Sequence, residues 1–263
     1  NLVSQITTNY LSNGVDLGAM FAPYNSVIPN FSQNWTTGPL LSFIPFKLAM
    51  SRDGVCQLAN VNGGKIYYLN STNIWTLSNS LSQSWMEMAI SDVTSNGYIC
   101  LAVVHSATSG IYISTNSGVT WAASTPALSG SNQWWGVSIS SDATTAFVVS
   151  SDNSTSSATG YVYSTRQTPY INNTSTWSQV PALPLAHWRE VAMSSSGQYV
   201  VACIANGNTA SYGNYYGIYY STNYGATWNN VTSASGTSLN IYLYALTMSD
   251  SGQYAVSCTN TNL

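Results

Sequence analysis

The chain has 263 residues, a formal net charge of −3 and only 5% charged residues. Its five lysines and arginines are too few to neutralise a run of phosphates, which argues against a nucleic-acid partner. No apolar run approaches the roughly 18 residues that a membrane-spanning helix requires. The length suits one domain with a substantial core, so we expect neither nucleic-acid binding nor membrane insertion.

The N-terminal region divides into an extension and part of a repeat. Residues 18–38 align without gaps with residues 160–180, and the two segments share their leading glycine and the tryptophans Trp35 and Trp177. Self-similarity at this distance indicates one supersecondary unit that is copied along the chain. We therefore interpret residues 1–17 as an N-terminal arm and residues 18–38 as the outer two strands of one unit.

A short phrase, a small residue followed by Met or Ile and then Ser, marks the start of each unit. Its five copies end at Ser51, Ser91, Ser140, Ser194 and Ser249. The fourth copy predicts the unit most clearly, with strands over 189–194, 198–205 and 217–222 and around Trp228. Residues 243–263 supply only the inner two strands of the last unit.

Four short strands per unit without helical periodicity predict an all-β fold, a five-bladed β-propeller of four-stranded antiparallel blades. The blades cover approximately residues 46–79, 85–124, 134–180, 187–232, and 243–263 together with 18–38, in one domain over 18–263. The N-terminal strands complete the last blade, a velcro closure, when both parts belong to one chain. The alternative is strand exchange between chains, which would give a fibre.

An octet is written twice, as STNSGVTW over 114–121 and as STNYGATW over 221–228. It resembles the Asp-box of the bacterial neuraminidase repeat propellers, a turn between the third and fourth blade strands with a packed tryptophan. The positions that carry the resemblance are Ser114, Asn116, Gly118, Trp121, Ser221, Asn223, Gly225 and Trp228. Asn replaces the usual Asp in both copies, so a structural turn is favoured over calcium or ligand binding.

The same resemblance implies which residues the chain would need if it were an active sialidase. A sialidase of this kind needs three arginines for the substrate carboxylate, a tyrosine with a glutamate partner, and a further acid. The only arginines are Arg52, Arg166 and Arg189, and the Arg-Ile-Pro phrase of the family is absent. The chain therefore resembles a non-catalytic member of the family.

Three charged residues, Lys47, Glu87 and Glu190, hold one repeat position, three residues before the Met or Ile of the phrase. The first strand of a propeller blade is innermost, so we expect these side chains to line the central channel. Two glutamates there could act as acid and base in glycoside cleavage. An ion pair or water network with Lys47 and Arg189 is the simpler interpretation.

Tryptophans gather just before the first strands, at Trp85, Trp134, Trp135 and Trp188. Exposed tryptophans at the face of a propeller would form flat platforms for sugar rings. Packing between blades is the alternative, because large aromatic side chains usually fill cores.

The cysteines Cys56, Cys100, Cys203 and Cys258 fall in the second strand of different units. Neighbouring sheets lie about 10 Å apart, whereas a disulfide needs Cα atoms within about 7 Å. We therefore expect four buried free thiols. With only His105 and His187 and no CxxC spacing, we predict no metal site and no cofactor.

Sequons for N-glycosylation occur at Asn30, Asn34, Asn70, Asn153, Asn172, Asn173 and Asn230. Most fall in predicted loops, where a glycan can be accommodated. We expect an extracellular protein, or one on a cell or particle surface, that acts as a structural or adhesion module. Its expected partners are glycans, copies of itself in a filament or particle, or other surface proteins. A sialidase-like glycoside hydrolase is the alternative function.

Overall fold

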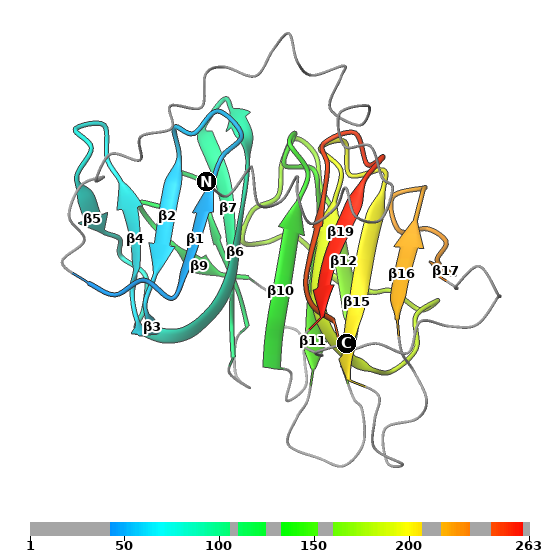
Figure 1. Cartoon of the computed structure of the whole chain (residues 1–263). Helices are drawn as coiled ribbons and strands as arrows, with labels where there is room; N and C mark the ends of the chain where they lie inside the picture. The colour runs from blue at the N-terminus through cyan, green and yellow to red at the C-terminus, as the bar shows by residue number, and fades with distance from the viewer. Residues whose placement is uncertain are drawn as a thin grey trace, which may run out of the picture. The chain divides into compact units, whose positions relative to one another are not determined.

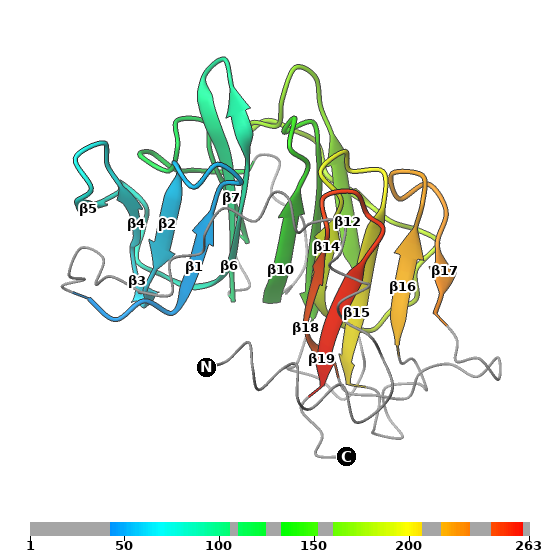
Figure 2. The same ribbon diagram turned by 45° about the horizontal axis from the view of Figure 1, so that its top comes forward.

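The computed structural model describes residues 43–105, 110–124, 133–151, 160–206, 217–231 and 243–259. The chain divides into two units, Asn1–Leu40 and Leu41–Leu263, and every described residue belongs to the second. Within this unit, antiparallel sheets follow one another along the chain (Figures 1 and 2). Among the described residues there is no helix long and apolar enough to cross a membrane.

Five sheets are formed by the described residues. The first contains β1 (Lys47–Met50), β2 (Gln57–Asn60), β4 (Ile66–Leu69) and β5 (Trp75–Leu77). The second contains β3 (Asn62–Gly64), β6 (Gln83–Thr94), β7 (Gly97–Val104), β8 (Ile111–Ser114) and β9 (Ala122–Ala123). The third contains β10 (Gln133–Ile139), β11 (Thr145–Ser151), β12 (Val162–Arg166) and β13 (Ser178–Gln179). The fourth contains β14 (His187–Met193), β15 (Val200–Asn206), β16 (Ile218–Ser221) and β17 (Asn229–Asn230), and the fifth β18 (Leu243–Met248) and β19 (Ala255–Thr259).

The all-β prediction is confirmed, and the strands of the fourth sheet agree with their predicted positions to within about two residues. The strand count differs from four in two places. The second sheet gains β3, which comes from the connection between β2 and β4 and pairs Asn62 with Ser84 on the free side of β6. The fifth sheet has two strands within the described part of the chain.

The recurrent serine phrase closes the hairpin between the first two strands of a sheet. Ser51 Oγ accepts a hydrogen bond from Cys56 N at 2.9 Å, and Ser140 Oγ accepts one from Thr145 N at 3.0 Å. Ser194 repeats this contact with the backbone nitrogen five residues further on, at 3.1 Å. The hydroxyl satisfies a backbone donor that the turn leaves unpaired, which explains why the phrase ends in serine.

Both octets form the turn that their sequence predicts. In the first, Ser114 Oγ accepts from Gly118 N at 2.9 Å, and Asn116 Oδ1 accepts from Thr120 N at 2.9 Å. The tryptophan Nε1 donates back to the glycine oxygen at 2.9 Å in both copies, from Trp121 and from Trp228. These contacts lie within the octet and use the asparagine oxygen, so the octet serves as a structural turn.

Each octet turn also packs on the preceding sheet. Gly118 has a φ of +83°, and a Cβ atom there would lie 2.3 Å from Leu58 of β2. Gly225 has a φ of +80°, and its Cβ would lie 2.5 Å from Phe147 of β11. Glycine is required at both positions because the conformation is left-handed and the neighbouring side chain occupies the space.

A β-bulge interrupts the first strand of four consecutive sheets at one repeat position. The pairing skips one residue in each of them, namely Met86, Trp135, Arg189 and Tyr244. A bulge leaves its extra residue unpaired and changes the direction of that side chain relative to the pleat. In each of the four sheets, the residue five positions before the serine that ends the recurrent phrase is left out of the strand pairing, and its side chain departs from the regular alternation.

Three of the four cysteines are buried free thiols, and Cys258 is exposed, which corrects the prediction of four buried ones. Cys258 lies on β19, in the sheet that has two described strands, so its side chain lacks a covering neighbour among the described residues. Burial raises the pKa of Cys203 to about 12, with a further contribution from Glu190. Thiols in such surroundings are poor nucleophiles.

Candidate functional site

The first strands of the five described sheets, β1, β6, β10, β14 and β18, are here called the inner strands. Consecutive inner strands contact one another, β1 with β6, β6 with β10, β10 with β14, and β14 with β18. Together they line a cavity of about 340 Å³, which we call the central cavity. Every inner strand contributes to its wall.

The charged residues of one repeat position lie together in the central cavity. Lys47, Glu87 and Glu190 all line it, as they would in a channel formed by the inner strands. Lys47 Nζ donates to Glu87 Oε2 at 2.6 Å, and the Glu87 side chain is 16% exposed. This ion pair spans the first and second sheets, so the one cation that the described residues contribute to the cavity wall has an acidic partner.

Glu190 has a different environment from Glu87. Burial and, to a smaller extent, the charge of Glu87 raise the pKa of Glu190 to about 8, although Lys47 and Arg189 act in the opposite direction. Glu190 is therefore mostly protonated at neutral pH and can donate a hydrogen bond. Gly136 holds the same repeat position in the third sheet, and a Cβ atom there would lie 2.8 Å from Glu190 Oε1. The missing side chain makes room for the Glu190 carboxyl.

The end of the central cavity near the bulges, here called the bulge end, carries a stack of side chains from four sheets. The Arg189 guanidinium lies over the Trp135 ring at 4.1 Å and over the Tyr244 ring at 4.6 Å. His105, which follows β7, meets the Trp135 ring edge to face at 4.9 Å. Both contacts of the Arg189 guanidinium, with Trp135 and with Tyr244, are within cation–π distance. In the described residues, Arg189 has no carboxylate within salt-bridge distance.

Three of the four tryptophans proposed as sugar platforms belong to the core. Trp85, Trp134 and Trp188 are 0%, 3% and 0% exposed, so they present no face to a ligand. Trp85 Nε1 donates to Gly64 O at 3.0 Å, and Trp188 Nε1 donates to Pro184 O at 3.2 Å. Only Trp135, the bulge residue, is partly exposed, and its face is covered by Arg189.

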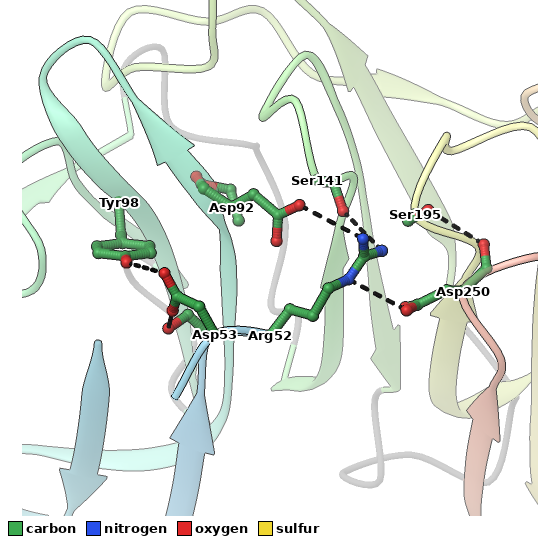
Figure 3. A network of polar contacts seen from close by, with 9 residues as sticks. Arg52, Asp53, Asp92, Tyr98, Ser141, Ser195 and Asp250 are labelled. Atoms are coloured by element: carbon green, nitrogen blue, oxygen red, sulfur yellow. Dashed lines mark hydrogen bonds and ion pairs between the residues drawn. The ribbon is translucent and has the colours of Figure 1, made fainter. Parts of the chain in front are cut away.

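The opposite end, here called the turn end, is formed by the residue after each phrase serine. Arg52 Nε lies 3.1 Å from Asp250 Oδ2, and its Nη1 lies 3.7 Å from Asp92 Oδ2 (Figure 3). Its Nη2 donates to Ser141 Oγ at 3.4 Å. Arg52 thus links the first sheet to the second, third and fifth.

A backbone ladder connects the same turns. Asp92 N donates to Ser141 O at 2.9 Å, Ser141 N to Ser195 O at 2.8 Å, and Ser195 N to Asp250 O at 2.9 Å. Each bond joins one sheet to the next. Repeat-equivalent turns are therefore tied together in chain order, with Arg52 across the remaining interval (Figure 3).

Beside this ladder, Asp53 accepts a short hydrogen bond from the Tyr98 hydroxyl (Figure 3). Hydrogen bonds from Ser51 and then from Tyr98 lower the pKa of Asp53. The bond to Asp53 raises the pKa of Tyr98 to about 12. Asp53 is exposed and its contact joins two neighbouring sheets, which suits a structural role.

The arginines do not converge on one pocket. Arg52 is at the turn end, Arg189 is at the bulge end, and Arg166, at the end of β12, lies over Tyr224 at 4.6 Å. The three-arginine cluster that a sialidase would need is therefore not present among them.

Four of the seven sequon asparagines lie within the described residues. Asn30, Asn34 and Asn153 lie outside the described residues. Asn70 Oδ1 accepts from Thr72 N at 3.0 Å, and Asn172 Oδ1 accepts from Thr174 N at 2.9 Å, so both side chains stabilise turns. Asn173 and Asn230 are partly exposed. Within the described part of the chain, His, Cys, Asp and Glu form no group of three or more that could hold a metal ion.

Comparison with solved structures identifies the architecture. A GH74 enzyme from Niastella koreensis matches with a TM-score of 0.53 and 21% identity, over 69% of this chain and 28% of that one. YCF48 from Cyanidioschyzon merolae matches with a TM-score of 0.56 and 16% identity, over 86% of this chain and 70% of that one. These are β-propeller proteins. The chain has a β-propeller fold.

The GH74 xyloglucanase from Xanthomonas campestris also matches, with a TM-score of 0.52 and 13% identity over 76% of this chain. The propeller spans less than a third of the length of the two GH74 enzymes, 28% and 31%. No family model matches the sequence, and no curated protein is similar enough to count as a relative. At these identities the likeness shows the fold alone, and membership of the neuraminidase repeat family stays a prediction.

Proposed function

We propose that this propeller is a non-enzymatic structural or adhesion module, extracellular or displayed on a cell or particle surface, that recognises glycans. The observation that carries the proposal is the separation of the three arginines, each of which is engaged by different neighbours. The cavity cation Lys47 is likewise occupied by Glu87. The arginines therefore do not form the carboxylate-binding cluster that a sialidase would need, which supports a non-enzymatic module.

The propeller closes as a ring of five blades within one chain, and residues 18–38 supply the outer strands of the fifth blade. Three observations support this arrangement. The fifth sheet has two described strands, Arg52 bridges the first and fifth sheets at 3.1 Å, and residues 160–180, the aligned segment, contain β12 and β13. A native mass spectrum tests the closure, because strand exchange between chains would give a polymer and the closed ring a discrete small species.

A glycan array with the purified protein tests recognition. Binding to a defined subset of glycans, lost on denaturation, is the expected result. A flat array together with self-association in the native mass spectrum would instead favour a module that binds only other proteins.

A glycoside hydrolase is the second candidate, and one observation favours it. Burial raises the pKa of Glu190 to about 8, whereas the neighbouring Glu87 forms an ion pair with Lys47. An acid and a carboxylate are the pair that glycoside cleavage requires. The X. campestris neighbour is a xyloglucanase, so xyloglucan belongs in the substrate panel. Turnover that is lost in both Glu87→Gln and Glu190→Gln would overturn the non-enzymatic proposal.

A further inference from the structure

The bulge end contains a cation that the fold itself does not neutralise. Arg189 is sandwiched between Trp135 and Tyr244, and none of the described carboxylates lies within salt-bridge distance of it. By contrast, Arg52 and Lys47 each have an acidic partner. The guanidinium carbon lies over both rings, at 4.1 Å from the Trp135 centroid and 4.6 Å from the Tyr244 centroid, and ring contacts of this kind do not use the N–H donors of the arginine.

The position of Arg189 follows from the repeat. Met86, Trp135, Arg189 and Tyr244 are the extra residues of four equivalent bulges. Bulges frequently re-aim side chains next to functional sites. Because the stacked residues come from three consecutive inner strands, the stack is fixed by the sheets and is not a flexible surface arginine.

The surroundings suit a ligand that is both anionic and ring-shaped. A carboxylate accepts two parallel N–H bonds from a guanidinium edge. Tyr244 is 55% exposed, so part of its ring is open to the C–H face of a sugar. The adjoining Glu190 contributes little negative charge at neutral pH, because burial raises its pKa to about 8.

We propose that the edge of Arg189 at the bulge end binds the carboxylate of a sugar acid, with the sugar ring against Tyr244. This inference rests on the proposed glycan recognition and specifies its chemistry. Neutral sugars lack the carboxylate, and simple carboxylates lack the ring that would contact the tyrosine. The site is distinct from the Lys47–Glu87 ion pair inside the central cavity.

The test is isothermal titration of the full chain with glucuronate, glucose and acetate. We expect glucuronate to bind with a dissociation constant in the millimolar range or tighter, and glucose and acetate to bind at least about tenfold more weakly. Arg189→Gln should weaken glucuronate binding about 10- to 100-fold, the usual worth of hydrogen bonds to a charged group. Arg166→Gln is the matched control, since Arg166 also stacks on a tyrosine but lies on β12, and it should leave the affinity unchanged.

Arg189→Lys, which keeps the charge but loses the planar fork, guards against misfolding of the glutamine variant and should give an intermediate affinity. Absence of glucuronate binding, equal binding of glucose or acetate, or unchanged affinity in both Arg189 variants would overturn the inference. Array binding confined to neutral glycans would overturn it while leaving the proposed function standing. Glycosidase turnover would remove the non-enzymatic proposal without changing the role of Arg189 in glucuronate binding.

Discussion

Two arginines lie at opposite ends of the central cavity in opposite kinds of surroundings. At the turn end, Arg52 lies between the carboxylates of Asp92 and Asp250. At the bulge end, Arg189 lies between the rings of Trp135 and Tyr244. The first arrangement satisfies the charge within the fold, and the second stabilises the cation but leaves its hydrogen-bonding edge free among the described residues. The partners of a charge, more than its position, therefore separate a structural cation from a binding one.

The largest expected change in the free energy of unfolding is at Trp188, and a much smaller one is expected at Arg189, the next residue along the chain. Trp188→Ala should lower the free energy of unfolding by about 3–5 kcal/mol, because Trp188 is fully buried and its removal leaves a cavity. Arg189→Gln, one residue along, should cost only about 1 kcal/mol, the loss of its cation–π contacts. Chemical denaturation of both variants measures the difference. Equal losses would mean that Arg189 is part of the structural core.

The pH dependence of stability should report on the carboxyl group of Glu190, the residue after Arg189. The pKa of Glu190 is raised from 4.5 to about 8 in the folded protein, so folding favours the protonated form. Its contribution is fully present below pH 4.5 and is lost progressively as the pH rises toward about 8. Glu190→Gln should therefore gain stability relative to the parent as the pH rises across this window. Melting temperatures of both proteins from pH 4.5 to 8 test this, and a constant difference would contradict the raised pKa.

Filling the space beside Glu190 should cause a smaller loss in the free energy of unfolding. Gly136→Ala places a Cβ 2.8 Å from Glu190 Oε1 and 3.0 Å from Glu190 Cα and Val149 Cγ2. Overpacking of this kind typically costs about 1–3 kcal/mol. The same substitution in a Glu190→Ala background should cost less, because the closest atom is gone. A double-mutant cycle by chemical denaturation measures the coupling, and additive losses would show that Glu190 is not the obstacle.

The smallest effect is expected at the turn end. Arg52→Ala should lower the free energy of unfolding by about 1 kcal/mol or less, since the Arg52 side chain is 48% exposed and solvent screens its ion pairs. The loss should shrink in about 1 M salt. Lys65→Ala is the control, because Lys65 has no acidic partner among the described residues. A loss that does not depend on salt would mean that Arg52 acts through packing.

The repeat made part of this architecture predictable. The phrase serine located the end of each inner strand, and its spacing grouped Lys47, Glu87 and Glu190, which line one cavity. The octets indicated their turns because serine, asparagine and glycine have specific roles in tight turns. Residues that repeat at one position share an environment in a ring of similar sheets.

The bulges were missed, and Trp135 was therefore grouped with three core tryptophans. A regular strand alternates its side chains between two faces. The residues three before each phrase serine are apolar, such as Val137 and Val191, so the positions five before should share their face. Instead the positions six before hold the buried residues, as at Trp134 and Trp188. This change of phase within one strand was the sequence signal for the bulge.

The contacts at the turn end also limit how similar the five copies of the repeat can be to one another. Its five equivalent positions hold one arginine, two aspartates and two serines, and the contacts depend on that mixture. Repeating the fourth sheet in all five copies would place five glutamates on the inner strands that line the cavity, with no lysine among them. Repeating the first would place arginine at all five positions and remove Asp92 and Asp250, the two carboxylates that pair with Arg52. A perfectly symmetric descendant of this sequence would therefore lose the ion pairs that Lys47 and Arg52 form with acidic residues of other copies, because those pairs depend on the differences between copies.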